Sequence, residues 1–243
     1  MIRLIAFLVY MMGYLVYSLP TLAKMKKLNP EMPVSERDQL IHQTPNKWSS
    51  TIMKITGSTV EVKGQEFLPD GPVVFVCNHE GDFDIPVLLA SINKPFGFIS
   101  KVEVKKAPII SSWMEVMNCV FIDRKDRRSA VQSIRDGVEK LKNGHSIVIF
   151  PEGTRSKGGP IGEFKAGGLR LAKDAGVPIV PIGIKGTADI FEKNNRLVRP
   201  ANVQINICQP IEHEKIVAKD MKDIAADVRK IIIESFEKER IAS

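Results

Sequence analysis

Short strand-like apolar runs alternate with helical periods between about residues 59 and 207, a pattern that few architectures accommodate. The predicted strands are Thr59–Val62, Val73–Cys77, Gly97–Ser100, Val120–Ile122, Ser146–Phe150, Ile179–Ile184 and Val203–Ile207. The predicted helices are Ile85–Ile92, Arg127–Lys142, Lys165–Asp174 and a longer one from Lys215 to Glu239. Such alternation is typical of an α/β fold. We therefore expect a single domain with a mixed, largely parallel central sheet that is covered by helices.

The length of 243 residues suits one sizeable α/β domain and is too short for two full ones. Because the pattern changes near residue 55, we expect residues 56–243 to form the α/β domain and residues 1–55 to form a helical, membrane-anchoring segment. The net charge of +7 suits an anionic partner. Nucleic acid is the least favoured partner, since the main domain has few aromatic residues and they are not interleaved with basic ones.

The N-terminal segment has no charged residue from Leu4 to Ala23, and lysines follow directly. About 20 apolar residues are enough to cross a bilayer as a helix. However, the helix carries three tyrosines on one face, and tyrosine prefers the headgroup region. A helix half-sunk in one leaflet therefore competes with a spanning helix and with a buried core helix. In both membrane arrangements we expect Lys24, Lys26 and Lys27 on the cytoplasmic side, which predicts the cell membrane with the α/β domain on its cytoplasmic face.

A second N-terminal helix is predicted from about Ser35 to Ile55. Ser35 and Asp38 have the spacing of a capping box at its start. The helix would either pair with the first helix at the membrane surface or simply pack on the domain.

The most informative polar run follows the predicted strand Val73–Cys77 and contains His79 and Asp84. Five residues on a regular helix would separate these side chains widely around the axis, so a contact requires His79 in the loop and Asp84 in the first helical turn. A neutral histidine can remove a proton from a hydroxyl, and a carboxylate on its other nitrogen fixes the tautomer. The chain has no GxSxG elbow, so the hydroxyl would belong to the substrate. Taken alone, the same spacing also occurs around structural or solvated histidines.

A second run, Phe150-Pro151-Glu152-Gly153-Thr154-Arg155-Ser156, follows another predicted buried strand. Gly153 permits a close backbone approach to a ligand, and the guanidinium of Arg155 suits a phosphate. Cationic residues also follow other predicted strands or begin helices: Lys101, Arg124 and Lys165. Ligands of such sheets gather beyond the strand ends, so this set predicts an anion site, although each charge alone could be solvated.

In this order, the runs Asn78–Asp84, Phe121–Arg124, Phe150–Ser156 and Val177–Gly183 resemble those of the 1-acyl-sn-glycerol-3-phosphate acyltransferase family. Two of its patterns are NHxSxxD and FPEGTRS, and the resemblance covers about residues 72–186. It implies that His79 is the general base and Asp84 its orienting partner. It also implies that the acceptor is bound by Lys101, Arg124, Glu152, Gly153, Thr154 and Arg155. Gly81 departs from the family pattern, because serine or threonine usually stands there.

The resemblance implies transfer of a fatty acyl chain from acyl-CoA or acyl-carrier protein to the sn-2 hydroxyl of 1-acyl-sn-glycerol-3-phosphate. No metal or prosthetic group is expected. Other phosphorylated acceptors, such as glycerol 3-phosphate or another lysophospholipid, are the main alternative. A metal-dependent hydrolase that uses His79 and a non-catalytic lipid-binding membrane protein are the remaining alternatives.

Overall fold

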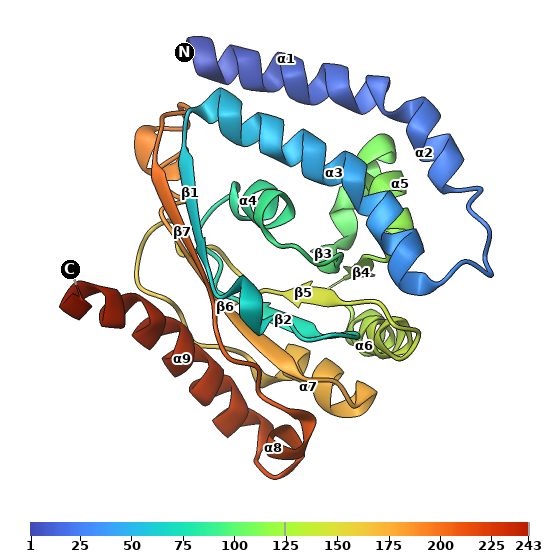
Figure 1. Ribbon diagram of the computed structural model, residues 1–243, viewed down its shortest axis with the longest axis vertical. Helices are drawn as coiled ribbons and strands as arrows, with labels where there is room; N and C mark the ends of the chain where they lie inside the picture. The colour runs from blue at the N-terminus through green and yellow to red at the C-terminus, as the bar shows by residue number, and fades with distance from the viewer. Residues whose placement is uncertain (124, 243) are drawn as a thin grey trace.

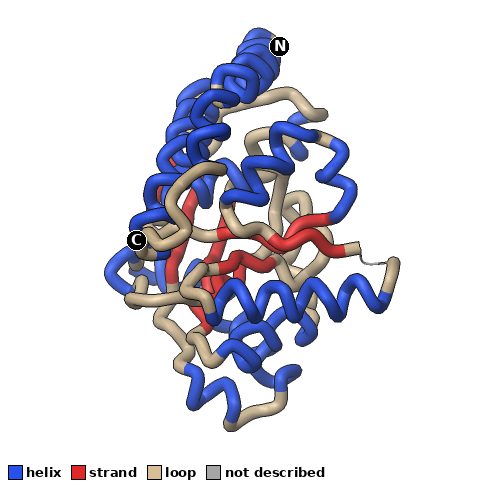
Figure 2. Tube along the Cα trace, turned by 90° about the vertical axis from the view of Figure 1, so that its right-hand side faces the viewer, coloured by secondary structure: helices blue, strands red, loops and turns tan. Residues whose placement is uncertain are grey.

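The computed structural model describes residues 1–123 and 125–242, and it has three layers (Figure 1). A seven-stranded sheet lies between one helical layer that contains α1, α3, α4 and α5 and another that contains α6, α7 and α9. Figure 2, turned by 90°, shows the strands near the middle and helices on both sides of them. The predicted α/β class is confirmed.

The sheet has the strand order β1-β7-β6-β2-β5-β3-β4. Only β6 and β7 pair antiparallel, so β1 and β7 run opposite to the other five strands and the sheet is mixed but mostly parallel, as predicted. All seven strands occur where the sequence predicts them, with ends shifted by one residue at most. Their bounds are Thr59–Lys63 (β1), Val74–Cys77 (β2), Gly97–Lys101 (β3), Val120–Ile122 (β4), Ile147–Ile149 (β5), Ile179–Lys185 (β6) and Asn202–Ile207 (β7).

The helices of the main domain connect these strands across the two faces of the sheet. Their bounds are Asp84–Ser91 (α4), Pro108–Val116 (α5), Arg127–Lys142 (α6), Ala166–Ala175 (α7), His213–Val217 (α8) and Met221–Ala242 (α9). Short 3₁₀ helices occur at Gln65–Phe67 (η1), Val102–Lys106 (η2) and Glu192–Asn194 (η3). The single C-terminal helix that the sequence predicts is therefore two helices, α8 and α9. Helix α5 lies within a stretch for which no helix was predicted.

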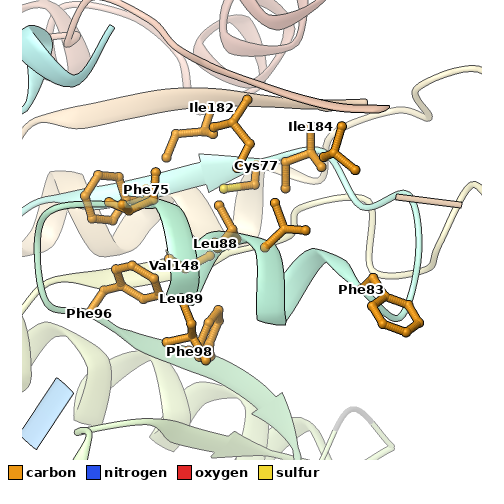
Figure 3. Packing of buried hydrophobic residues seen from close by; sticks show 14 of the residues in the cluster. Phe75, Cys77, Phe83, Leu88, Leu89, Phe96, Phe98, Val148, Ile182 and Ile184 are labelled. Atoms are coloured by element: carbon orange, nitrogen blue, oxygen red, sulfur yellow. The ribbon is translucent and has the colours of Figure 1, made fainter. Parts of the chain in front are cut away.

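Successive residues of β2 face opposite layers, as the pleat of a strand requires. Phe75 and Cys77 pack with α4 and α3, whereas Val74 and Val76 pack with α7 and α9. Figure 3 shows Phe75 and Cys77 between Ile182 of the neighbouring strand and Leu88 of α4. Because β2 is completely buried on both faces, its end is a rigid support for the loop that follows.

The N-terminal segment forms α1 (Ile2–Tyr17), α2 (Leu19–Met25) and α3 (Val34–Thr56), and α1 lies along α3 (Figure 1). Among the described residues, no single helix has both the length and the apolarity needed to span a bilayer. Only α1 and α2 taken together meet that criterion, and they are bent by 47° relative to each other. The uncharged run from Leu4 to Ala23 therefore forms two helices with different axes, which meet at Ser18.

The predicted capping box at the start of α3 is also wrong. Pro33 is the N-cap residue of α3, and no side-chain capping bond forms there. The Asp38 carboxylate instead points into the protein and contacts Nδ1 of His145 at 2.6 Å. The Asp38 carboxylate thus contacts a residue far away in the sequence and does not cap the start of α3, although the local pattern predicts a cap there.

Candidate active site

Several parallel strands end at one edge of the sheet, and a cavity of about 640 Å³ opens there. His79 follows β2, Phe150 follows β5, and Lys101 ends β3, so one edge collects side chains from three strands. The cavity combines a few polar groups with many apolar ones, as ligand sites commonly do. Its apolar lining includes Leu15, Trp48, Ile85, Leu89, Phe98, Ile99, Val104, Ile110, Trp113, Met114, Met117 and Phe150.

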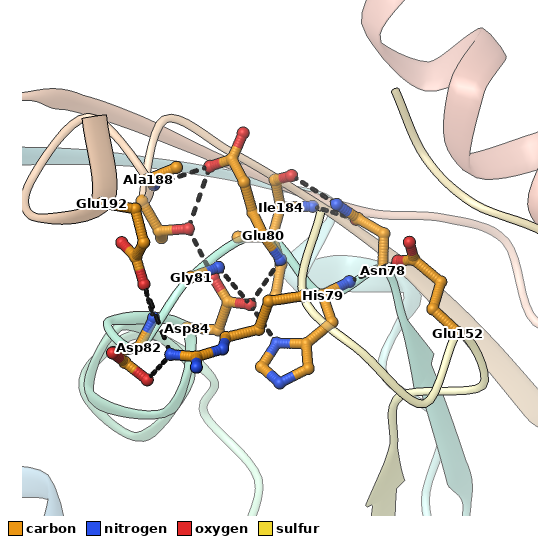
Figure 4. Close-up of polar contacts among 12 residues, drawn as sticks. Asn78, His79, Glu80, Gly81, Asp82, Asp84, Glu152, Ile184, Ala188 and Glu192 are labelled. Atoms are coloured by element: carbon orange, nitrogen blue, oxygen red, sulfur yellow. Dashed lines mark hydrogen bonds and ion pairs between the residues drawn. The ribbon is translucent and has the colours of Figure 1, made fainter. Parts of the chain in front are cut away.

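His79 and Asp84 are in direct contact, as the sequence predicts. Nδ1 of His79 lies 2.7 Å from Oδ2 of Asp84, with His79 in the loop and Asp84 in the first turn of α4 (Figure 4). The Asp84 side chain is fully buried, whereas that of His79 is 22% exposed and lines the cavity. Because Asp84 engages Nδ1, Nε2 is the nitrogen that a substrate can reach.

A buried hydrogen-bond network holds the Asp84 carboxylate in place. Oδ2 also accepts the backbone N–H groups of Glu80 (2.7 Å) and Gly81 (3.1 Å), and Oδ1 accepts the hydroxyl of Thr187. The Thr187 hydroxyl also lies 2.9 Å from Oε2 of Glu80, and this Oε2 accepts the N–H of Ala188 at 3.1 Å. The segment after β6 therefore supports the His79 loop from behind (Figure 4).

The backbone and the ring of His79 are held as well. Oε1 of Glu152 accepts the N–H of His79 at 2.7 Å, and the N–H of Ser156 donates to the carbonyl of His79 at 2.8 Å. The imidazole stacks on the ring of Phe150, with the centroids 4.2 Å apart and the planes 24° from parallel. The Phe150–Ser156 run thus orients His79 on several sides, which reduces the conformational freedom that a reaction would have to restrict.

Arg155 reaches the cavity from the same run and meets two carboxylates. Its Nη1 is ion-paired with Oδ1 of Asp82 and lies 3.6 Å from Oε1 of Glu192. Oε1 of Glu192 also accepts the N–H of Asp82 at 2.6 Å. The Glu192 side chain is only 9% exposed, and burial raises the pKa of its carboxyl despite that hydrogen bond.

Gly81 and Glu192 occupy adjoining space. A Cβ atom at residue 81 would lie 2.7 Å from Oε2 of Glu192, closer than a normal contact allows. The departure of Gly81 from the family pattern therefore has a structural reason, because the carboxylate of Glu192 fills the volume that a side chain at 81 would need.

Of the remaining predicted site residues, some line the cavity and others do not. Lys101, Gly153 and Thr154 line the cavity with His79 and Arg155. Glu152 is buried, and its two carboxylate oxygens accept the N–H groups of His79 and Gly162, so it supports the loops from behind the cavity. Arg124 falls outside the described residues. Lys165 is exposed at the N-cap of α7 and is not among the residues that line the cavity.

Sequence reasoning assigned no role to four other residues at this site, although two of them, Glu80 and Asp82, lie in the Asn78–Asp84 run. Glu80 and Thr187 are joined by a contact that spans 107 positions, and Asp82 and Glu192 by one that spans 110. Contacts between residues so far apart in the sequence cannot be inferred from local spacing. The only available signal was Gly81, since an unusual glycine beside a reactive histidine indicates that another group approaches closely.

No group of three or more His, Cys, Asp or Glu side chains in the described part of the chain is arranged to hold a metal ion. Cys77 and Cys119 are free and buried, and burial raises the pKa of the Cys119 thiol to about 12. These two cysteines behave as small core residues, in agreement with the absence of any cysteine pairing motif.

Comparison with known proteins places the chain in a family. The sequence model of the Acyltransferase family matches residues 59–185, which include His79, Asp84, Arg155 and all but the last strand. The chain is 29% identical over 223 residues to a probable 1-acyl-sn-glycerol-3-phosphate acyltransferase of Mycoplasma genitalium, covering 86% of this chain and 80% of that protein. It is 41% identical over 159 residues to a chloroplastic 1-acyl-sn-glycerol-3-phosphate acyltransferase of Arabidopsis thaliana, covering 64% of this chain and 44% of that protein.

A solved structure agrees over nearly the whole chain. The crystal structure of the 1-acyl-sn-glycerophosphate acyltransferase PlsC from Thermotoga maritima superposes with a TM-score of 0.84 at 26% identity, covering 98% of this chain and 95% of that one. The fold and the family model together define an α/β acyltransferase. The chain belongs to the acyltransferase family, in the branch that contains the 1-acyl-sn-glycerol-3-phosphate acyltransferases.

Proposed function

We propose that this acyltransferase moves a fatty acyl chain from a thioester donor, acyl-CoA or acyl-carrier protein, to the sn-2 hydroxyl of 1-acyl-sn-glycerol-3-phosphate. The observation that carries the proposal is the His79–Asp84 pair, whose 2.7 Å contact leaves Nε2 for a substrate at the cavity. The names of the relatives supply the acceptor, which the pair alone does not identify.

In this mechanism, Nε2 of His79 removes the proton of the acceptor hydroxyl while its oxygen attacks the thioester carbonyl carbon. The Asp84 carboxylate stabilises the imidazolium that forms. When the carbon–sulfur bond breaks, the imidazolium returns the proton to the sulfur, so the products are the ester and the free thiol. The backbone N–H groups of Glu80, Gly81 and Asp82 already donate to carboxylates, so the oxyanion requires other donors.

Arg155 and Lys101 serve the acceptor phosphate in this proposal. Both line the same cavity as His79, and a guanidinium binds phosphate in a charge-assisted, bidentate way. Gly153 and Thr154 lie beside them at the cavity wall, and Glu152 acts through the backbone of His79. Arg124 remains a proposed phosphate ligand on the basis of the sequence resemblance only.

The apolar part of the cavity suits an acyl chain, and its wall reaches the N-terminal helices through Leu15 of α1. One face of α1 packs on the core through Leu4 and Phe7. Its other face exposes large apolar side chains: Ile2, Ile5, Leu8, Val9, Met12 and Val16. Such a face supports a helix that lies in one leaflet, which would keep the cavity at the membrane surface where its lipid substrates reside. We propose the cytoplasmic face of the cell membrane for the catalytic domain.

An acceptor panel tests the proposal. Full-length protein in liposomes would be given 1-acyl-sn-glycerol-3-phosphate, glycerol 3-phosphate or a lysophospholipid with a larger headgroup, each with acyl-CoA and with acyl-carrier protein. We expect the highest kcat/KM with the first acceptor. A higher value with either of the others would reassign the acceptor, and no ester product with any combination would refute the function.

The variant Arg155→Ala tests the phosphate site within the same assay. Charge-assisted hydrogen bonds contribute about 1.5–3 kcal/mol, so we expect KM for the phosphorylated acceptor to rise at least about tenfold. KM for the acyl donor should change much less. An unchanged acceptor KM would remove Arg155 from the site.

A further inference from the structure

The guanidinium that faces the cavity is already occupied by carboxylates of the protein itself. Nη1 of Arg155 is ion-paired with Oδ1 of Asp82, and Oε1 of Glu192 lies 3.6 Å away. Asp82 and Arg155 both line the cavity. A phosphate that binds Arg155 must therefore either share its donors with these carboxylates or displace one of them.

The two carboxylates are not equivalent. The Glu192 side chain is 9% exposed, and its Oε1 is fixed by the N–H of Asp82 at 2.6 Å. The Asp82 side chain is 55% exposed, and its carboxylate is ion-paired with Arg155. An exposed ion pair of this kind is weak, so Asp82 can exchange with a solute at little cost, whereas Glu192 is held in place.

We propose that Asp82 is an internal stand-in for the acceptor phosphate. When the phosphorylated lipid enters, the Asp82 carboxylate leaves Arg155 and the phosphate takes its place. This inference rests on the proposed function, and it adds to that site a residue that sets the affinity for the acceptor phosphate. Figure 4 shows Asp82 and Glu192 on the same side of the His79 loop, as the exchange requires. Before the lipid binds, Asp82 holds the flexible arginine in the position from which it can receive the phosphate.

The exchange has a consequence for turnover. The lysolipid acceptor and the diacyl product carry the same phosphate, so a bond to that phosphate stabilises both of them equally. Binding that is equal before and after the reaction lowers KM without raising kcat, and it retains the product. By competing for Arg155, Asp82 weakens both complexes by the same factor and so speeds product release.

The variant Asp82→Asn tests this directly, since asparagine keeps the shape and the backbone N–H but loses the charge. An exposed ion pair of about 0.2–1 kcal/mol corresponds to a factor of up to about five. We expect KM for 1-acyl-sn-glycerol-3-phosphate to fall about two- to fivefold. The inhibition constants of the diacyl product and of glycerol 3-phosphate, a soluble form of the headgroup, should fall by the same factor.

Two controls make the result specific. Asp189→Asn makes the same chemical change in the segment after β6, where Asp189 is exposed and pairs with Lys193 at 3.0 Å, and it should leave the acceptor KM as it is. In an Arg155→Ala background, Asp82→Asn should no longer lower the acceptor KM, because the group for which the two anions compete is gone.

A rise in acceptor KM, or no change, in Asp82→Asn would overturn the exchange and make Asp82 a structural partner of Arg155. A fall that persists without Arg155 would also overturn it. These outcomes differ from failure of the proposed function, which would appear as absence of acyl transfer by the unchanged protein.

Discussion

The protein contains two His–Asp pairs with nearly the same geometry and quite different surroundings. Nδ1 of His79 lies 2.7 Å from Oδ2 of Asp84, and Nδ1 of His145 lies 2.6 Å from Oδ2 of Asp38. His79 lines the cavity and is 22% exposed, whereas the His145 side chain is 7% exposed and joins the loop before β5 to helix α3. A histidine–carboxylate contact therefore does not identify a catalytic pair. What matters is whether the second ring nitrogen can meet a substrate.

The hydrogen bonds and ring contacts that hold the two His–Asp pairs also differ. Around Asp84, two backbone N–H groups and the Thr187 hydroxyl fix the carboxylate, and Phe150 stacks on the imidazole. Around His145, Nδ2 of Asn118 lies 3.1 Å from the imidazole, and this asparagine also contacts Lys140. The first arrangement orients one ring toward a cavity, whereas the second ties three segments of the chain together.

The largest expected effect is on kcat, and it distinguishes the Asp84 carboxylate from the Asp38 carboxylate. Asp84→Asn should lower kcat for acyl transfer about 10²–10⁴-fold, because His79 loses the group that fixes its tautomer and stabilises the imidazolium. Asp38→Asn should keep kcat of the folded protein within a few fold. Steady-state kinetics on both purified variants would measure this. Equal losses of kcat in the two variants would show that the two His–Asp pairs do not differ in function.

The next effect tests how closely the loop around Asp84 is packed. In Gly81→Ser, the new Cβ would meet Oε2 of Glu192 at 2.7 Å, so either the loop or the Glu192 carboxylate, which accepts the N–H of Asp82 in that loop, must shift. Because displacements of about 1 Å at an active site cost up to about 10²-fold, we expect kcat/KM to fall ten- to hundredfold.

A second substitution provides the control for this effect. Glu192→Ala in the Gly81→Ser background removes the obstructing carboxylate and should recover at least about tenfold. Gly167→Ser adds the same side chain where nothing lies within 4 Å, and it should have little effect. If the double variant were no better than Gly81→Ser alone, the steric explanation would be wrong.

The smallest effect concerns the second pair and appears in stability. His145→Ala leaves the mostly buried Asp38 carboxylate without its main partner, which should cost about 1–3 kcal/mol in the free energy of unfolding. For a chain of this length, that corresponds to a fall of several degrees in Tm, which differential scanning calorimetry can measure. A Tm equal to that of the unchanged protein, together with lost activity, would show that His145 acts in the reaction.

Much of this architecture could be predicted from the sequence because it depends on local patterns. The seven strands appear as apolar runs, and His79 and Asp84 are only five positions apart, so a strand–loop–helix geometry suffices to join them. The run around Glu152 and Arg155 was also recognisable, but the different roles of its residues could not be predicted. Glu152 faces the backbone of His79 across 73 positions, and the spacing of residues carries no information about that contact.

The errors in the sequence prediction have similar causes. Asp38 looked like a capping residue because the pattern was local, yet its partner His145 is 107 positions away. The composition of the N-terminal apolar run shows its length but not the 47° bend near Ser18. Glu192 left no local signal, since only the folded loop after β6 brings it to Arg155.

The most direct test of the central claim is the rate of acyl transfer by His79→Ala in protein shown by its melting curve to be folded. A general base contributes about 10²–10⁴-fold, so kcat with 1-acyl-sn-glycerol-3-phosphate should fall by at least about a hundredfold while Tm stays near that of the unchanged protein. A folded His79→Ala variant that transfers acyl chains at nearly the normal rate would contradict the assignment of His79 as the base.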